Sequence, residues 1–219
     1  MARSIALTGS VCLLLALAGA SSAAVTRSIK ACKTSFHEGC SGKGGGHPSG
    51  PKSHRLFFVA HDGRCPDTRR HPNAHDVEVI RAATLRLVNR ERARHGERQL
   101  HWNEHLVRAA QSHTHSMAFG DYFAHEGAGG GTPLSRLRQA GYISRRKGYE
   151  IGENIAWGSG RLGTPHAIVA GWMRSPGHRA NILDPRYRDT GVGVSAHLGR
   201  LAGGQSGGIY TQDFGVIIG

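Results

Sequence analysis

Residues 76–219 contain four segments with a helical period, and each has a signal for the start of a helix. Thr132-Pro133 and Thr164-Pro165 both place a hydroxyl residue before a proline, which is typical of the first turn of a helix. Asp76 and Asn103 predict two further helix starts. Glycines predict the ends of three segments, at Gly96, Gly120 and Gly141. The residues predicted to face inward are Ile80, Ala83, Thr84, Leu87 and Val88; Leu106, Ala109, Ala110, His113 and Met117; and Ile168, Val169, Trp172 and Met173.

Short strand-like runs lie between and after these helical segments, at Asn154 to Trp157, Gly191 to Leu198 and Gly208 to Phe214. Helices grouped around a few mostly late strands predict an α+β fold with layers. The chain has 219 residues, of which 38% are hydrophobic, so one domain with a real core and an extension is expected.

The first residues have the pattern of a secretory signal peptide. Arg3 precedes the apolar run Val11 to Ala20, and the small residues Ser21 and Ala23 follow it. We expect a signal peptide over 1–23, with cleavage after Ala23 or Ala24 and secretion of the mature chain. The alternative is an uncleaved anchor, although the apolar run is short for a bilayer span of ~20 residues.

Residues 24–75 are rich in Gly, His, Pro and Ser and carry a dense excess of basic residues. No helical or alternating period occurs there apart from a short apolar patch at 56–60, so a flexible low-complexity tail is expected. Its histidines could bind transition metals loosely, but the spacing favours a solvated basic arm. Cleavage would leave Cys32, Cys40 and Cys65, which allow at most one disulfide among them, and the sequence does not say which pair.

Charge and missing motifs restrict the function. The chain has 28 Lys and Arg residues against 15 Asp and Glu residues, so an exported form should gather at anionic wall polymers or membrane surfaces. Nucleic-acid binding is not expected, because no recognition motif or interleaving of aromatic and basic residues occurs. The H-E-x-x-H, G-x-S-x-G and phosphate-loop motifs are absent. His113 lies on an apolar stripe, which favours a core histidine.

Three separated stretches carry residues suited to chemistry. His125 ends Tyr122-Phe123-Ala124-His125, Glu153 stands in Gly152-Glu153-Asn154-Ile155-Ala156, and His178 follows Ser175-Pro176-Gly177. Each is predicted to lie in a loop or at the end of an element, where side chains from distant segments can converge.

On these motifs the chain resembles the CAP superfamily of SCP-like domains, which includes cysteine-rich secretory, antigen-5 and pathogenesis-related proteins, and its bacterial branch in particular. The resemblance runs from about Asp76 to Gly219 and implies a three-layer α-β-α sandwich for that domain. The matching stretches are Leu87-Val88-Asn89 with Glu91-Arg92, Leu100 with Trp102-Asn103, Leu106 with Ala109-Ala110, Gly152 to Ala156, Ser175 to Leu183, Gly191 to Val194 and Gln212-Asp213-Phe214-Gly215.

The resemblance also implies a cleft with two His and two Glu, in which the histidines can hold a divalent ion such as zinc. Carried over, the histidines are His125 and His178 and the first Glu is Glu153, but Ser175 stands where the second Glu is usual. This departure weakens a hydrolase mechanism that needs paired carboxylates. Two readings stay open: a zinc site of His125, His178 and Glu153, or a structural network in which Glu153 orients a histidine.

The expected function is a secreted, envelope-associated binding module whose cleft takes a lipid, a sterol-like molecule or a wall-derived ligand. The alternative is a metal-dependent hydrolase or protease that uses His125, Glu153 and His178. Whether the chain is an enzyme is not decided by the sequence.

Overall fold

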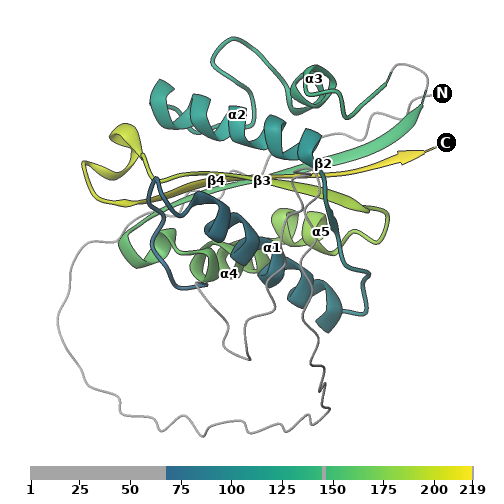
Figure 1. The fold of residues 1–219 in the computed structure, drawn as a ribbon, viewed down its shortest axis with the longest axis horizontal. Helices are drawn as coiled ribbons and strands as arrows, with labels where there is room; N and C mark the ends of the chain where they lie inside the picture. Colours follow the sequence, from purple (N-terminus) through teal and green to yellow (C-terminus); the bar gives the residue numbers. More distant parts are fainter. Residues whose placement is uncertain (1–67, 145–146, 219) are drawn as a thin grey trace, which may run out of the picture. The chain divides into compact units, whose positions relative to one another are not determined.

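A four-stranded sheet organises residues 68–144 and 147–218, the part of the chain that the computed structural model describes (Figure 1). The strand order is β1-β3-β4-β2. The strands are β1 (His101–Trp102), β2 (Gly148–Ser159), β3 (Asp189–Ser195) and β4 (Gly207–Ile218). β1 pairs with β3 in parallel, whereas β3 and β2 both run antiparallel to β4. β2 is therefore an edge strand, paired with β4 along its whole length.

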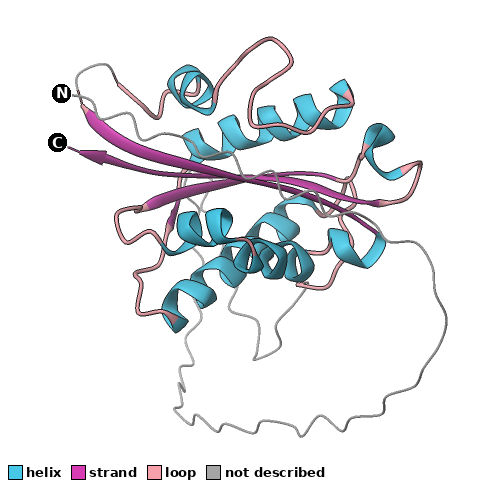
Figure 2. Ribbon diagram, turned by 180° about the vertical axis from the view of Figure 1, so that it is seen from behind, coloured by secondary structure: helices cyan, strands magenta, loops and turns pink. Residues whose placement is uncertain are grey.

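Helices cover both faces of this sheet. α2 (Glu104–Gly120) and α3 (Pro133–Gln139) lie on one face, and α1 (Val77–Arg94), α4 (Pro165–Arg174) and α5 (Pro176–Leu183) lie on the other (Figures 1 and 2). Two 3₁₀ helices, η1 (Gly160–Gly163) and η2 (Gly199–Ala202), precede α4 and β4. The three-layer α-β-α sandwich expected from the resemblance is confirmed. No helix among the described residues is long and apolar enough to cross a membrane.

At three of the four predicted helix starts, the side chain that the sequence indicated caps the helix by accepting a hydrogen bond from the first turn. Asn103 accepts hydrogen bonds from the backbone N–H groups of His105 and Leu106. Thr132 and Thr164 accept one each, at 3.2 Å and 3.4 Å. Asp76 precedes α1 as predicted but makes no side-chain cap, because its carboxylate instead pairs with Arg70 at 3.0 Å and accepts from Asn73.

The strands depart more from the sequence predictions. β2 and β4 are longer than predicted, β3 ends at Ser195, and neither β1 nor α5 was predicted. The full length of β2 could not be predicted from alternating polarity, because polar side chains in this strand, such as Glu153 and Asn154, are buried like its apolar ones. α5 starts at Ser175-Pro176, the same hydroxyl-proline signal as in α3 and α4, but it is only 8 residues long.

The core fills both spaces between the sheet and the helices. On the face of α1, α4 and α5, the buried residues include Ile80, Leu87, Val88, Trp172, Val192, Tyr210 and Phe214. Trp172 is 1% exposed, which confirms its predicted inward position, and its Nε1 donates to the Ile155 carbonyl at 3.2 Å. On the face of α2, the buried residues include Leu106, Ala109, Met117, Leu137, Ile155 and Ile209.

Glycines in β3 let α2 lie directly on the sheet. A Cβ at Gly191 would lie 2.2 Å from the Val107 amide nitrogen, and a Cβ at Gly193 would lie 2.4 Å from the Ala110 carbonyl oxygen. Both distances are far below van der Waals contact, so neither position has room for a side chain.

Arg92 ties α1 to the end of α5. Its side chain is fully buried, and the guanidinium donates to the carbonyl oxygens of Arg98, Ile182 and Asp184 at 2.6, 2.6 and 3.0 Å. The Ile182 and Asp184 carbonyls lie at the C-terminal end of α5, where helix carbonyls have no partner within the helix. A buried cation is tolerated here because it binds these free carbonyls.

Several predictions fall outside the described residues. These are the signal peptide 1–23, the tail up to residue 67, the apolar patch 56–60, and Cys32, Cys40 and Cys65. The last residues of the predicted tail are described and contact the domain: Pro72 is buried, and the Thr68 carbonyl accepts from the His166 amide at 2.8 Å.

Candidate functional site

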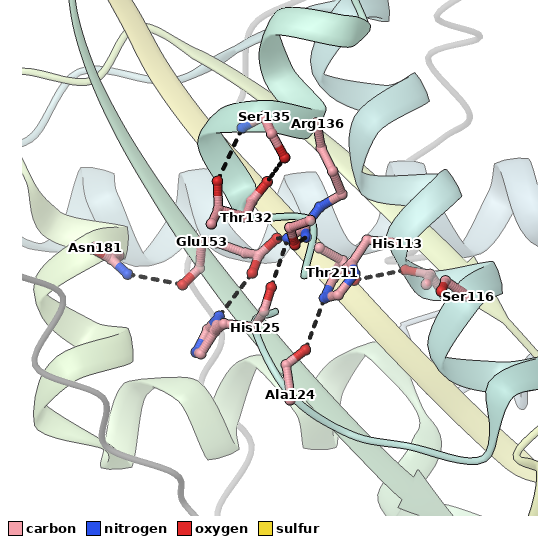
Figure 3. Close-up of polar contacts among 12 residues, drawn as sticks. His113, Ser116, Ala124, His125, Thr132, Ser135, Arg136, Glu153, Asn181 and Thr211 are labelled. Carbon is pink, nitrogen blue, oxygen red and sulfur yellow. Dashed lines mark hydrogen bonds and ion pairs between the residues drawn. The ribbon is translucent and has the colours of Figure 1, made fainter. Parts of the chain in front are cut away.

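Glu153 lies in the middle of β2, and its side chain is completely buried. Its Oε1 accepts a hydrogen bond from Nδ1 of His125 at 2.7 Å, and its Oε2 accepts from Nη2 of Arg136 at 2.5 Å (Figure 3). His125 comes from the loop after α2, and Arg136 comes from α3. Because an ionised carboxylate can only accept, Nδ1 of His125 is the donor of this hydrogen bond, and in the neutral form of the ring Nε2 then has the lone pair.

Arg136 also fastens the loop that carries His125. Its Nη2 donates to the His125 carbonyl at 3.0 Å, and its Nη1 donates to the Gly131 carbonyl at 2.8 Å. One guanidinium therefore holds the backbone of His125 and the carboxylate that orients the imidazole.

His113 supports the same loop from α2. The ring is 1% exposed, and Nε2 donates to the carbonyl of Ala124, the residue before His125, at 2.9 Å. Burial lowers the pKa of His113 to about 4, so the ring is neutral at physiological pH. His113 is therefore the buried core histidine that the sequence favoured, and it positions the start of the His125 loop.

Glu153 is ionised in spite of its burial. Burial alone raises its pKa, but the hydrogen bond from His125 and the charge of Arg136 act in the opposite direction, and the pKa is lowered overall. An ionised carboxylate in this interior is possible because both of its oxygens have donors.

Asp213 is a second carboxyl group next to Glu153. It is the residue opposite Glu153 in the β2–β4 pairing, and it is 1% exposed. Neither of its oxygens receives a hydrogen bond from the described residues. Burial and the charge of Glu153 raise the pKa of Asp213 well above its ordinary value. The two carboxyl groups thus differ in charge: one is ionised and one keeps its proton, which avoids like-charge repulsion.

His178 lies in the first turn of α5, at the N-terminal end of that helix. The ring is half-buried, and burial, with a smaller contribution from the charge of His125, lowers its pKa. Its backbone carbonyl accepts from Asn154 of β2 at 3.1 Å. α5 lies on the face of the sheet opposite to α3, whose Arg136 bonds the His125 carbonyl and Glu153.

The structure therefore brings His125 and Glu153 into direct contact and places His178 within electrostatic range of His125. No hydrogen bond or ion pair within the described residues joins the ring of His178 to either of them. Asn181, one turn further along α5, donates to the Glu153 backbone carbonyl at 3.2 Å and to the Asn154 side chain at 2.9 Å (Figure 3).

Ser175 lies at the junction of α4 and α5 and is 5% exposed. Its amide donates to the Trp172 carbonyl at 3.1 Å, and its hydroxyl does not cap α5. The carboxyl beside Glu153 is supplied by Asp213, which the sequence analysis missed together with Arg136. Asp213 could have been noticed as the one charged residue in the strand predicted at Gly208 to Phe214. Arg136 carried no local signal, because its partners are distant in sequence.

Glu153 is not free to be the third ligand of the zinc site that the resemblance implied. Within residues 68–144 and 147–218 no group of three or more His, Cys, Asp or Glu is placed to hold a metal ion. Both oxygens of Glu153 are already bonded to donors. Two imidazoles are then the only protein donors left of the three expected, whereas catalytic zinc sites usually have three protein ligands.

The protein is thus a three-layer sandwich in which the partly exposed His125 is paired with the buried Glu153. Residues 85–214 match the model of the cysteine-rich secretory protein family, CAP, and the chain belongs to this family.

Three bacterial proteins are similar to this chain. YkwD of Bacillus subtilis, an uncharacterized protein, is 34% identical over 138 residues, which are 63% of this chain and 48% of YkwD. YlbC of the same species, an uncharacterized membrane protein, is 34% identical over 130 residues, or 59% of this chain and 32% of YlbC. The chain thus spans less than half of either relative. A crystal structure of an extracellular SCP-domain protein from Bacillus anthracis superimposes with a TM-score of 0.53 and 28% identity, covering 65% of this chain and 44% of that one.

Proposed function

We propose that this protein is an exported, envelope-associated binding module whose ligand contacts His125 and His178. The ligand would be a lipid or a wall-derived molecule that offers hydroxyl or amide donors. In the neutral form of the His125 ring, the lone pair on Nε2 is the acceptor that such a donor requires.

The observation that carries the proposal is the complete engagement of Glu153. A general base or a nucleophile needs a free lone pair within reach of the substrate. Glu153 is buried and has a donor on each oxygen, so its part is to hold His125 in one tautomer and orientation. A rigidly oriented imidazole at a partly buried surface is suited to recognition.

Export is supported by the relatives, and the charge supports association with the envelope. The B. anthracis protein of similar fold is called extracellular, and YlbC is called a membrane protein. A chain with a formal net charge of +13 will concentrate at anionic surfaces such as a wall or a membrane. Export of this chain is part of the proposal.

The test is sedimentation with isolated cell-wall sacculi at about 0.15 M and about 0.5 M salt, since the higher concentration screens attraction by net charge. We expect the wild type to bind at both salt concentrations, and His125→Ala/His178→Ala to bind about 10- to 30-fold more weakly, as for two lost hydrogen bonds of about 1 kcal/mol each. The matched control is His75→Ala/His101→Ala, which removes two exposed histidines elsewhere. Equal binding by wild type and the site variant would refute the proposal.

A hydrolase that uses the same residues is the second candidate, and the His125–Glu153 pair is what favours it. A carboxylate that orients an imidazole through Nδ1 also prepares Nε2 to accept a proton. Release of soluble fragments from the sacculi, abolished by His125→Ala, would support this candidate. Zinc titration of the purified protein checks whether the two histidines hold an ion; no binding near neutral pH would leave a metal-free site.

A further inference from the structure

The geometry points to a second binding site, a basic pocket at the start of α4 that takes a phosphate-bearing ligand. The pocket has a volume of about 350 Å³ and is lined by Arg69, His71, Arg161, Thr164, His166 and Ala167. This volume is at the lower end of the ~300–1,000 Å³ range of small-molecule sites. The pocket itself does not depend on the proposed function. Only the source of the phosphate, outside the cell, rests on the proposed export.

The pocket is built from two segments far apart in sequence. Residues 68–71 precede α1, whereas 161–167 run from η1 into α4. The His166 amide donates to the Thr68 carbonyl at 2.8 Å and joins the two segments. Pro72 is buried directly after the first segment, so the backbone that carries Arg69 and His71 is fixed against the domain.

The charges in the pocket have the same sign and are not neutralised. None of the described residues that line it is acidic. Arg69 and Arg161 are exposed, and within the described residues neither guanidinium has a carboxylate partner. Two arginines beside one cavity produce a positive potential that an anion would relieve.

Guanidinium chemistry selects the class of anion. The planar guanidinium group of Arg can donate two parallel hydrogen bonds to the oxygens of a phosphate or a carboxylate. Two guanidinium groups can bind one phosphate group from two sides. The backbone donors of α4 contribute little directly, because the Ala167 amide donates to Thr164 and the His166 amide to Thr68. The helix dipole still favours a negative charge at this end. We therefore assign the recognition to Arg69 and Arg161.

The test is an NMR titration of the full chain with sn-glycerol 3-phosphate and with inorganic pyrophosphate at constant ionic strength. We expect saturable shifts of the amides of 68–71 and 161–167. Arg69→Ala/Arg161→Ala should weaken binding at least about 10-fold, because it removes the charge-assisted hydrogen bonds that both guanidinium groups would donate. Both arginines are exposed, so this variant should unfold at the wild-type temperature.

The control variant Arg90→Ala/Arg98→Ala removes the same charge from two exposed arginines outside the pocket. It should bind within about 2-fold of wild type, because net charge at a distance is screened by salt. Equal weakening in both variants, or shifts that do not saturate, would overturn the inference, because attraction by net charge alone would then explain them. His125→Ala/His178→Ala should leave the titration unchanged, so the two proposals can fail separately.

Vesicles of phosphatidylglycerol and phosphatidylcholine distinguish the sources of the phosphate. Binding to phosphatidylglycerol vesicles that glycerol phosphate displaces would identify a lipid headgroup. Binding of soluble glycerol phosphate without vesicle binding would identify a free or polymer-borne phosphodiester. Both results support the pocket, and failure of all probes would refute it.

Discussion

Replacing Asp213 with asparagine should stabilise the protein at neutral pH, and the gain should grow with pH. Asp213 is fully buried beside the ionised Glu153, and both conditions raise its pKa in the folded state. An unfolded Asp titrates near ~3.9. Above that pH the unfolded chain has lost a proton that the folded chain keeps, so stability falls as pH rises until the folded pKa is reached.

The size of the effect follows from this difference in proton binding. One proton changes the free energy of unfolding by about 1.4 kcal/mol per pH unit. The introduced asparagine would have the shape of the neutral Asp213 side chain and an N–H group to donate to Glu153. Near the unfolded pKa of ~3.9 the two proteins should therefore have similar stability, and Asp213→Asn should gain about 1.4 kcal/mol for each further pH unit.

The measurement is urea unfolding at intervals of about one pH unit from ~4 to ~7, and the pH at which the difference levels off gives the folded pKa of Asp213. Glu153→Gln is the control, because this substitution should lower the stability at neutral pH where Asp213→Asn should raise it. The pKa of Glu153 is lowered, so its contribution is present above the unfolded pKa of ~4.3 and is lost as pH falls through the folded value. Its deficit should be largest at neutral pH. A constant deficit for Asp213→Asn at every pH would refute this reasoning.

Three other substitutions test the packing, each measured by urea unfolding at neutral pH. Trp172→Ala should cost about 3–5 kcal/mol through the cavity it leaves, and near-wild-type stability would place the indole at a surface. Gly193→Ala should cost about 1–3 kcal/mol or more, because the new Cβ would meet the Ala110 carbonyl at 2.4 Å; a neutral effect would mean that α2 shifts freely. Arg92→Met should cost roughly 1–3 kcal/mol for each carbonyl left without a donor, and a loss below about 1 kcal/mol would contradict its assigned contacts.

Sequence reasoning succeeded where the cause of a structure is local. Thr132, Thr164 and Asn103 cap helices through bonds to amides two or three residues away, so their pattern is visible in the sequence. Arg136 and Asp213 belong to the site because both lie next to Glu153. Arg136 is 17 residues from Glu153 in the sequence, and Asp213 lies opposite Glu153 on the neighbouring strand β4. No local period reveals such partners.

The positions of His125 and His178 in space also could not be predicted from the sequence. The resemblance named His125 and His178, but it could not show that α5, which carries His178, lies on the other face of the sheet from α3, whose Arg136 bonds the His125 carbonyl. It also could not show that Glu153 would have no oxygen free, since this depends on α3 reaching β2.

The side chains that bond the backbone of β2 have a consequence for association between copies of the chain. β2 lies at the edge of the sheet and is 12 residues long, and an open edge of this length is a template for strand addition and aggregation. Asn181 of α5 and Trp172 of α4 donate to the backbone carbonyls of Glu153 and Ile155, two alternate residues of this strand. These two helices thus occupy acceptors that an incoming strand would need. Loosening α5 would expose the strand that carries Glu153 to pairing with a second copy.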